Sequence, residues 1–318
     1  MSSAWRRLLG LAIVAVSVAI PMMRVADRPV DTLITPWGAP PSQFMDLQGQ
    51  LVHYRDQGPR DDPEPLVLLH GTSASLHTWD GWTRVLMRQR RVIRIDLPGF
   101  GLTGPWTGAY AGRPYQGDSY ARFVFDMLDQ LAVPKMVVAG NSLGGEVAWR
   151  MAVSSPSRVT RLVLVDPAGL SDAGGEFPLA WRLLRMPYVG ALAQSLITRG
   201  LVRQGLVRAV ADPARISDEQ VERYYYLALR EGNREALRQA LLAHEPGTGV
   251  AHVTGVTQPT LLLWGAQDRL IPVANARRFA ADIAGSQLVV FDELGHIPQE
   301  EDPLRSLAPV KTFLGLPP

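Results

Sequence analysis

The sequence has no cysteine among its 318 residues. This absence excludes disulfide bonds, thiolate catalysis and metal sites built on cysteine ligands, although it does not decide the compartment. Charge is also scarce, with 19% charged residues and a formal net charge of +2. Because no block of like charges is present, the composition gives no case for nucleic-acid binding.

Internal repeats and low-complexity segments are absent too, apart from one apolar run near the N-terminus. What the chain does have is a 47% apolar composition, which is typical of a globular protein with a sizeable core. Its length allows one large domain or two smaller ones.

The N-terminus carries information about location. Arg6 and Arg7 precede an uncharged run from Leu8 to Met23, a pattern typical of secretory signals, and Ser17-Val18-Ala19 offers a small-x-small cleavage site. The run is short for a full span but long enough for an uncleaved anchor in a thinned bilayer. A buried core helix is the third interpretation. We expect residues 1–23 to be an anchor or a signal, and the rest of the chain to be exported.

Short apolar strands alternate with helical stretches over most of the remaining chain. A proline-rich segment, 24–43, is interpreted as a linker and is followed by an alternating strand at 51–55. Further strands are then predicted at 66–69, which is continuously apolar, and at 92–95, 135–139, 161–165, 260–264 and 287–291. This alternation predicts an α/β fold with a mainly parallel, doubly wound sheet.

The alternation is interrupted once. Between the strands that end near Asp166 and Trp264 the sequence shows only helical stretches, such as 221–230 and 234–243. We therefore expect a core in two parts, 44–170 and 255–318, with a helical cap at 171–254 lying over the strand ends.

A serine follows one of the predicted strands. Gly140, Ser142 and Gly144 fill the pattern Gly-x-Ser-x-Gly between the strand and a helix that begins near Glu146. A strand–turn–helix of this kind holds the central side chain out from the sheet, and glycines on both sides avoid backbone collisions. The amide after the serine stands at a helix N-terminus, where developing negative charge is stabilised. We predict that Ser142 is a nucleophile, the alternative being an ordinary glycine turn.

A nucleophilic serine needs a base that takes its proton during attack. The six candidates are His53, His70, His77, His244, His252 and His296. Only His296 comes just after the last strand, at the carboxyl edge of the sheet where the serine also emerges. Asp268 follows the preceding strand and is the expected carboxylate that orients the imidazole. Asp166 also ends a strand and is the rival for that role.

In their order and positions, these motifs resemble the α/β-hydrolase family from about Phe44 to Leu314. The matching motifs are His70-Gly71-Thr72, Asp96-Leu97-Pro98-Gly99-Phe100-Gly101, Gly140-Asn141-Ser142-Leu143-Gly144-Gly145, Gly265-Ala266-Gln267-Asp268 with Pro272, and Gly295-His296. The resemblance implies a triad of Ser142, Asp268 and His296. It also implies oxyanion-hole amides from Thr72 and Leu143, and a structural role for His70.

Contacts to substrate are harder to assign from the sequence. Asn141, beside the serine, either touches a substrate or holds a loop, and Trp181 in the cap either lines a pocket or packs in the cap's own core. We name both as candidate substrate contacts. We expect neither a metal ion nor a cofactor to be required.

Ser142 and Ile297 reduce the number of activities expected for a member of this family. Family members that act on epoxides or haloalkanes carry aspartate at the nucleophile position, and Ser142 argues against both. Members that cleave carbon–carbon bonds in ring-fission products share the Gly-Asn-Ser elbow, but they typically have tryptophan directly after the catalytic histidine, where this chain has Ile297.

We therefore expect a serine hydrolase, carboxylesterase- or lipase-like, that cleaves esters of small to medium apolar acyl groups through an acyl-enzyme at Ser142. Carbon–carbon hydrolysis and a non-catalytic ligand receptor on the same fold are the alternatives. The expected partners are a small-molecule ester and, through the N-terminal segment, a membrane, with the catalytic domain outside the cytoplasm or, after signal cleavage, secreted or periplasmic. The oligomeric state is left open.

Overall fold

The computed structural model describes residues 24–170, 174–244, 247 and 250–317. The predicted signal or anchor, residues 1–23, lies outside this described part. Within it, no helix is long and apolar enough to cross a membrane.

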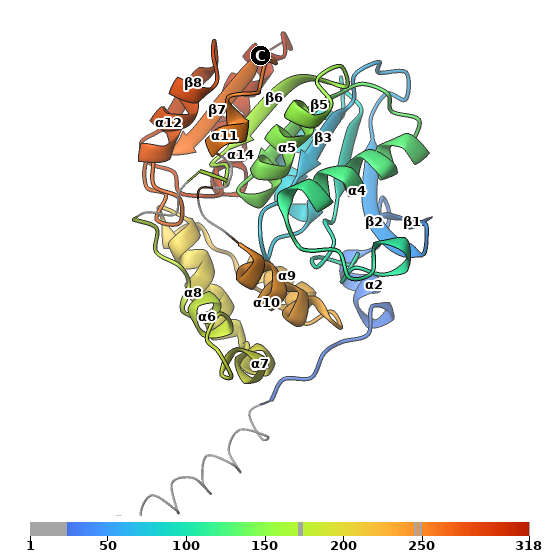
Figure 1. The fold of residues 1–318 in the computed structure, drawn as a ribbon, viewed down its shortest axis with the longest axis vertical. Coiled ribbons are helices and arrows are strands. Elements are labelled where there is room, and N and C mark those ends of the chain that lie inside the picture. The colour runs from blue at the N-terminus through green and yellow to red at the C-terminus, as the bar shows by residue number, and fades with distance from the viewer. Residues whose placement is uncertain (1–23, 171–173, 245–246, 248–249, 318) are drawn as a thin grey trace, which may run out of the picture.

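An eight-stranded sheet forms the centre of the described chain (Figure 1). Its strands are β1 (Gln43–Leu47), β2 (Gln50–Gln57), β3 (Leu66–Leu69), β4 (Val92–Ile95), β5 (Met136–Asn141), β6 (Val159–Val165), β7 (Thr260–Gly265) and β8 (Gln287–Phe291). Their order in the sheet is β1-β2-β4-β3-β5-β6-β7-β8. The pairs β1–β2 and β2–β4 are antiparallel, and the other five pairs are parallel. This confirms the predicted fold class.

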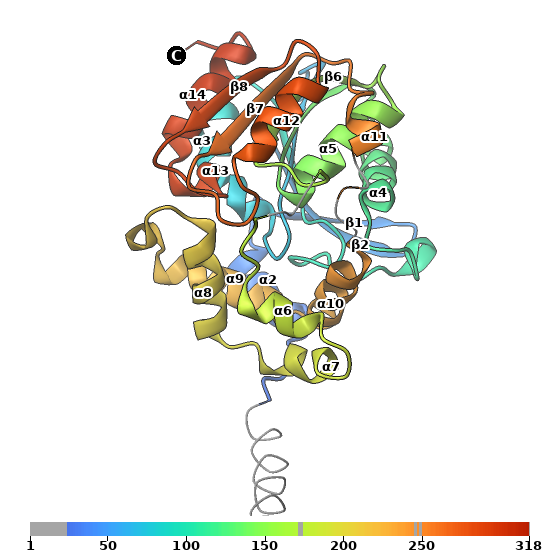
Figure 2. The same cartoon turned by 60° about the vertical axis from the view of Figure 1, so that its left-hand side comes forward.

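Helices cover both faces of the sheet (Figure 2). The larger apolar cluster joins one face to α4 (Gly117–Gln130), α5 (Leu143–Ser154) and α12 (Ala274–Asp282). The second cluster joins the other face to α3 (Asp80–Leu86) and α14 (Pro303–Phe313). Strands covered on both sides must be apolar along their whole length, which is why β3 reads Leu-Val-Leu-Leu and is buried throughout. Three short helices complete this part: η1 (Leu76–Trp79), η2 (Gly108–Tyr110) and α13 (Pro298–Glu301).

The chain between β6 and β7 forms a cap whose regular elements, in the part that the structure describes, are all helices. Its elements are α6 (Leu179–Leu184), α7 (Gly190–Ala193), η3 (Gln194–Leu196), α8 (Arg199–Ala209), η4 (Pro213–Arg215), α9 (Asp218–Ala228), α10 (Asn233–Ala243) and α11 (Val250–Val253). In Figure 1, α6 to α10 form a lower layer beneath the sheet, whereas α11 lies beside α5.

Polar contacts fix α9 to the core. Glu300 on α13 accepts hydrogen bonds from the side chains of Gln220 and Tyr224, each at 2.7 Å, and forms an ion pair with Arg223. Because these three residues all lie on α9, one buried carboxylate holds the helix next to the segment that follows His296.

Residues 24–43 are more structured than the predicted linker. They contain a helix, α2 (Asp31–Trp37), whose Leu33 is buried against Leu102 of the core and Leu227 of the cap. The apolar residues of this segment are few, and their partners lie far away in the sequence. For that reason its local composition is typical of a linker, although the segment is packed against both the core and the cap.

The first part of this segment, residues 24–37, is called the strap below. Its backbone pairs with the end of α9, where Arg28 N donates to Leu229 O at 2.7 Å and Glu231 N donates to Arg28 O at 2.8 Å. Arg234 on α10 binds Asp27, with Nε 2.8 Å from Oδ1. The strap therefore joins the cap to the core, as Figure 2 shows where α2 lies beside α9.

Candidate active site

The predicted nucleophile stands in a strained turn between β5 and α5. Ser142 has φ 55° and ψ −119°, a conformation that costs on the order of 1–3 kcal/mol for a residue with a side chain. A Cβ on Gly140 would lie 2.1 Å from the Gly144 oxygen, and one on Gly144 would lie 2.1 Å from the Leu69 oxygen. Both glycines of the pattern are therefore required by close backbone approach.

The predicted base and acid meet at the neighbouring strand ends. His296 follows β8 and Asp268 follows β7, and His296 Nδ1 lies 2.7 Å from Asp268 Oδ2. The other oxygen, Oδ1, accepts from the backbone amides of Leu270 at 2.7 Å and Ile271 at 2.9 Å. With Nδ1–H bound to the carboxylate, Nε2 is the nitrogen available to a serine. Ser142 and His296 line the same two cavities.

The rival acid does not make this contact. Asp166, at the end of β6, accepts a hydrogen bond from the Gly265 amide at 2.9 Å, and no bond from it to His296 is found among the described residues. It nevertheless lies close by, since polar side-chain atoms of Asp166, Asp268 and His296 all fall within 4.8 Å of one another. Burial, followed by the charge of Asp268, raises the pKa of Asp166 well above its usual range.

The two residues expected to supply the oxyanion amides line one cavity with the serine. Thr72 follows the turn after β3, Leu143 is the first residue of α5, and both line the larger cavity with Ser142. Neither amide donates a hydrogen bond to another group in the described part of the chain. Their positions suit the predicted oxyanion role, in which two N–H groups await a developing negative charge.

The loop that carries His296 is held from two directions. Asn141 Nδ2 donates to His296 O at 2.9 Å and to Val165 O at 3.1 Å. Of the two roles predicted for Asn141, this geometry supplies the one that holds a loop, although the residue also lines the smaller cavity.

Glu301, which sequence reasoning did not single out, holds the other side of the loop. Its Oε2 accepts from Gly295 N at 2.7 Å, and its Oε1 accepts from Ala211 N at 2.9 Å and Asp212 N at 3.0 Å. One carboxylate thus joins the histidine loop to the end of α8. The acidic pair Glu300-Glu301, directly after Pro298-Gln299, is the local sequence signal that could have indicated such a role.

Two cavities open beside Ser142. The larger, about 310 Å³, is lined partly by charged side chains, namely Asp118, Glu146, Arg150 and Arg185. The smaller, about 120 Å³, is lined by cap and core residues that include no Asp, Glu, Lys or Arg. Thr72 and Trp181 line both, together with Ser142 and His296. Trp181 thus lies where the sequence predicted a substrate contact.

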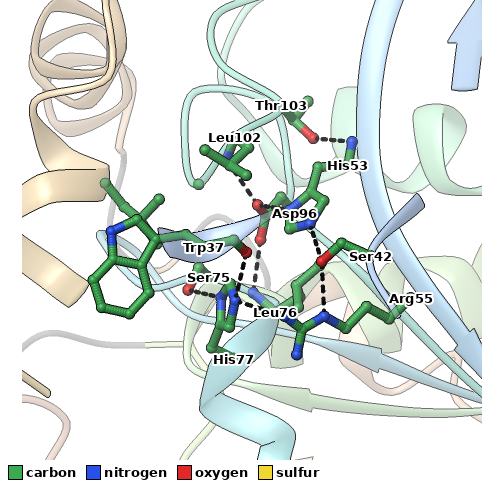
Figure 3. A network of polar contacts seen from close by, with 12 residues as sticks. Trp37, Ser42, His53, Arg55, Ser75, Leu76, His77, Asp96, Leu102 and Thr103 are labelled. Atoms are coloured by element: carbon green, nitrogen blue, oxygen red, sulfur yellow. Dashed lines mark hydrogen bonds and ion pairs between the residues drawn. The ribbon is translucent and has the colours of Figure 1, made fainter. Parts of the chain in front are cut away.

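A second serine–histidine–aspartate group lies elsewhere (Figure 3). His53 Nδ1 lies 2.6 Å from Asp96 Oδ2, and His53 Nε2 lies 2.9 Å from Ser42 Oγ. Asp96 also accepts from the backbone amides of Leu76 at 2.7 Å and Leu102 at 2.8 Å. Although burial opposes it, the nearby His53 imidazole lowers the pKa of Asp96. None of the three polar side chains lines either cavity at Ser142. The group connects β2 to the residue before β1 and to the residue after β4.

His70 has the structural role that the motif implies. It is fully buried, its Nδ1 lies 2.8 Å from Gly71 O, and its Nε2 accepts from Leu97 N at 2.9 Å. Burial lowers its pKa. The neutral ring therefore connects the turn after β3 to the turn after β4.

Comparison with known proteins places the chain in a family. The sequence pattern of the family described as alpha/beta hydrolase fold matches residues 64–303, which include the strands from β3 to β8, the whole cap segment and all three residues of the predicted triad. The fold and the match together define an α/β hydrolase. The chain belongs to the alpha/beta hydrolase fold family.

Individual relatives differ in what they act on. The dihydrolipoyllysine-residue acetyltransferase component of the acetoin cleaving system of Pseudomonas putida is 32% identical over 267 residues, covering 82% of this chain and 66% of that protein. The chain thus spans just under two thirds of that relative. The 2-hydroxymuconate semialdehyde hydrolase of a Pseudomonas species is 30% identical over 264 residues, 79% of this chain and 86% of that one. A solved bacterial membrane phospholipase A has a TM-score of 0.71, with 98% of both chains covered and 22% identity, a likeness of fold alone.

Proposed function

We propose that this hydrolase cleaves carboxylic esters with small to medium apolar acyl groups, through an acyl-enzyme at Ser142. The observation that carries the proposal is the small uncharged cavity, about 120 Å³, that shares Ser142 and His296 with the larger cavity. An apolar acyl chain fits such a lining, and each buried methylene contributes about 0.8 kcal/mol. The larger, partly charged cavity then takes the alcohol portion.

The geometry supports a conventional acyl transfer. Ser142 Oγ attacks the ester carbon while His296 Nε2 takes its proton, and Asp268 stabilises the imidazolium that forms. The amides of Thr72 and Leu143 donate to the oxyanion. The carbon–oxygen bond then breaks, and the proton on Nε2 passes to the departing alkoxide. Water attacks the acyl-enzyme with His296 again as base, releasing the acid and restoring the serine.

A panel of p-nitrophenyl esters of increasing chain length tests the proposal directly. We expect kcat/KM to rise with each added methylene until the smaller cavity is full and then to fall. Ser142→Ala is the control for background hydrolysis. A fluorophosphonate probe that labels wild type but not Ser142→Ala would separate this function from that of a non-catalytic receptor. If no ester is cleaved and no label forms, the proposal is wrong.

A second candidate is hydrolysis of a carbon–carbon bond in a ring-fission dienoate. The 30% identity to a 2-hydroxymuconate semialdehyde hydrolase favours it. Such a substrate carries a carboxylate, and Arg150 lines the larger cavity. Arg150 is already bound to Glu146 and Asp118, each at 2.9 Å, and these charges compete with an anionic substrate. Turnover of a dienoate with negligible ester cleavage would favour this candidate over the first.

We also propose that residues 1–23 place the hydrolase domain at a membrane, outside the cytoplasm. Arg6, Arg7 and the uncharged run from Leu8 to Met23 support this. Fractionation should find the protein in the membrane pellet, with its hydrolase domain open to external protease in spheroplasts. A shortened soluble periplasmic form would instead indicate signal cleavage, and a soluble cytoplasmic form would contradict export.

A further inference from the structure

Asp166 is a buried carboxyl group that the proposed mechanism does not use. Its exposure is 0%, and its Oδ1 accepts a hydrogen bond from Gly265 N at 2.9 Å. Its second oxygen, Oδ2, is buried and has no donor in the described part of the chain. A buried carboxylate with one donor is costly, since an ionised group removed from water needs several hydrogen bonds or an opposite charge.

The neighbouring carboxylate of Asp268, by contrast, accepts several hydrogen bonds. Asp268 receives three donors, from the amides of Leu270 and Ile271 and from His296 Nδ1. The charge of the pair therefore belongs on Asp268, because three donors stabilise an anion there and only one does so on Asp166. Two anions at this separation repel each other strongly in a buried site, so such pairs hold one proton between them.

We infer that Asp166 carries this proton and donates it in a hydrogen bond to Asp268, which makes Asp166 a positioning residue for the acid of the triad. One carboxylate oxygen of each residue lies within 4.8 Å of the other, and the side chain of Asp268 raises the pKa of Asp166 through a hydrogen bond as well as through its charge. This inference rests on the proposed triad, and it adds a fourth donor to the carboxylate that orients His296.

The charges around Asp166 agree with a protonated side chain. Burial raises its pKa, the charges of Asp268 and Glu301 raise it further, and only the Gly265 amide opposes them. His296 is the third titratable side chain of the cluster with Asp166 and Asp268, and its Nδ1 is already bound to Asp268. A cation held by the same three side chains would have to break that bond, so a proton suits the site better than a metal.

The effect on catalysis follows from the same contacts. The donated hydrogen bond fixes the rotamer of Asp268 and withdraws part of its charge from His296. Without it, Asp268 is freer to rotate and holds the imidazolium proton more strongly. Removing the donor should therefore lower kcat more than it changes KM, and it should move the acid limb of the pH profile to higher pH.

Two substitutions at one position separate the roles of proton donor and charge. Asp166→Asn keeps a donor of the same shape, whereas Asp166→Ala removes it. With p-nitrophenyl butyrate we expect Asp166→Asn to stay within about threefold of wild type, with an unchanged acid limb. Asp166→Ala should lose about tenfold or more in kcat and shift that limb. If Asp166→Asn is as damaging as Asp166→Ala, or if both behave as wild type, the inference is wrong.

A spectroscopic measurement tests the inference without using hydrolysis. A protonated, buried carboxyl group gives a C=O infrared stretch that ionised carboxylates lack. The difference spectrum of full-length wild type against Asp166→Asn, at neutral pH, should contain that band. Absence of the band would overturn the inference even if esters are cleaved, and its presence would support it even if the ester proposal fails. A poorly folded Asp166→Ala protein would not affect this comparison.

Discussion

The side-chain amide of Asn141 donates a hydrogen bond to the backbone oxygen of His296, at 2.9 Å. The two residues are 155 positions apart in the chain, yet this contact joins the turn that carries the nucleophile to the loop that carries the base. The relative position of Ser142 and His296 thus depends in part on one amide group.

Replacement of Asn141 by alanine should reduce turnover while leaving substrate binding nearly intact. The variant loses both donors, to His296 and Val165, and small misplacements of catalytic groups cost up to about 100-fold in rate. We expect kcat to fall by about tenfold or more, with KM within about twofold of wild type. Asn275→Ala, which removes a similar amide on α12 that lines neither cavity at Ser142, is the matched control. A kcat equal to that of wild type would show that the contact is dispensable.

Loss of the nucleophile should remove ester hydrolysis without unfolding the protein. Ser142→Ala and His296→Ala are expected to lose on the order of 10⁴-fold or more in kcat, and Asp268→Asn somewhat less. Circular dichroism and the melting temperature check the fold. Greater damage from Asp166→Asn than from Asp268→Asn would mean that the acid has been assigned to the wrong aspartate.

The length of the preferred acyl chain should depend on Gly205. This residue of α8 lines the smaller cavity, and a Cβ added there would meet no atom within 4 Å. Gly205→Leu should therefore fill the cavity and move the optimum of the ester panel to shorter chains. It should also stabilise α8 by about 0.5–1 kcal/mol, since glycine is a poor helix former. Gly200 is exposed on the same helix, so Gly200→Leu should stabilise α8 without changing the preferred acyl-chain length. If the optimal acyl-chain length of Gly205→Leu is the same as that of wild type, the acyl group does not bind in the smaller cavity.

The buried His77 should make the protein sensitive to acid. Burial is the main reason that its pKa falls to about 3, whereas the ring in an unfolded chain has a pKa of about 6.5. Between these values the unfolded chain binds a proton that the folded chain does not, so stability falls as pH falls. The contribution is about 1.4 kcal/mol for each pH unit below about 6.5.

Urea unfolding of His77→Gln and wild type, from pH 7 down to pH 4, measures this contribution. The stability advantage of wild type over the variant should shrink steadily as the pH is lowered. His252→Gln, at an exposed position, is the control. A difference between wild type and His77→Gln that is constant over this range would contradict the expectation.

Much of this site was predictable because its residues follow strands. Asp268 and His296 come directly after apolar segments of the sequence, and parallel strands bring their carboxyl ends to one edge. The strain at Ser142 is visible locally as well, in its two flanking glycines.

The remaining features depend on contacts that a local pattern does not contain. The burial of Leu33 depends on Leu102 and Leu227, and the role of Glu301 depends on the place where α8 ends. That Oδ2 of Asp166 has no donor among the described residues can be recognised only when the positions of all neighbouring donors are known.

We expect the strap to limit which part of the cap moves when a substrate enters. It binds α9 and α10 from one side through Arg28 and Arg234, and Glu300 binds α9 from the other. By contrast, residues 177–193, which hold α6 and α7, form no ion pair within the described chain. We therefore expect α9 and α10 to stay in place when a substrate enters, and α6 to move, because its Trp181 lines both cavities.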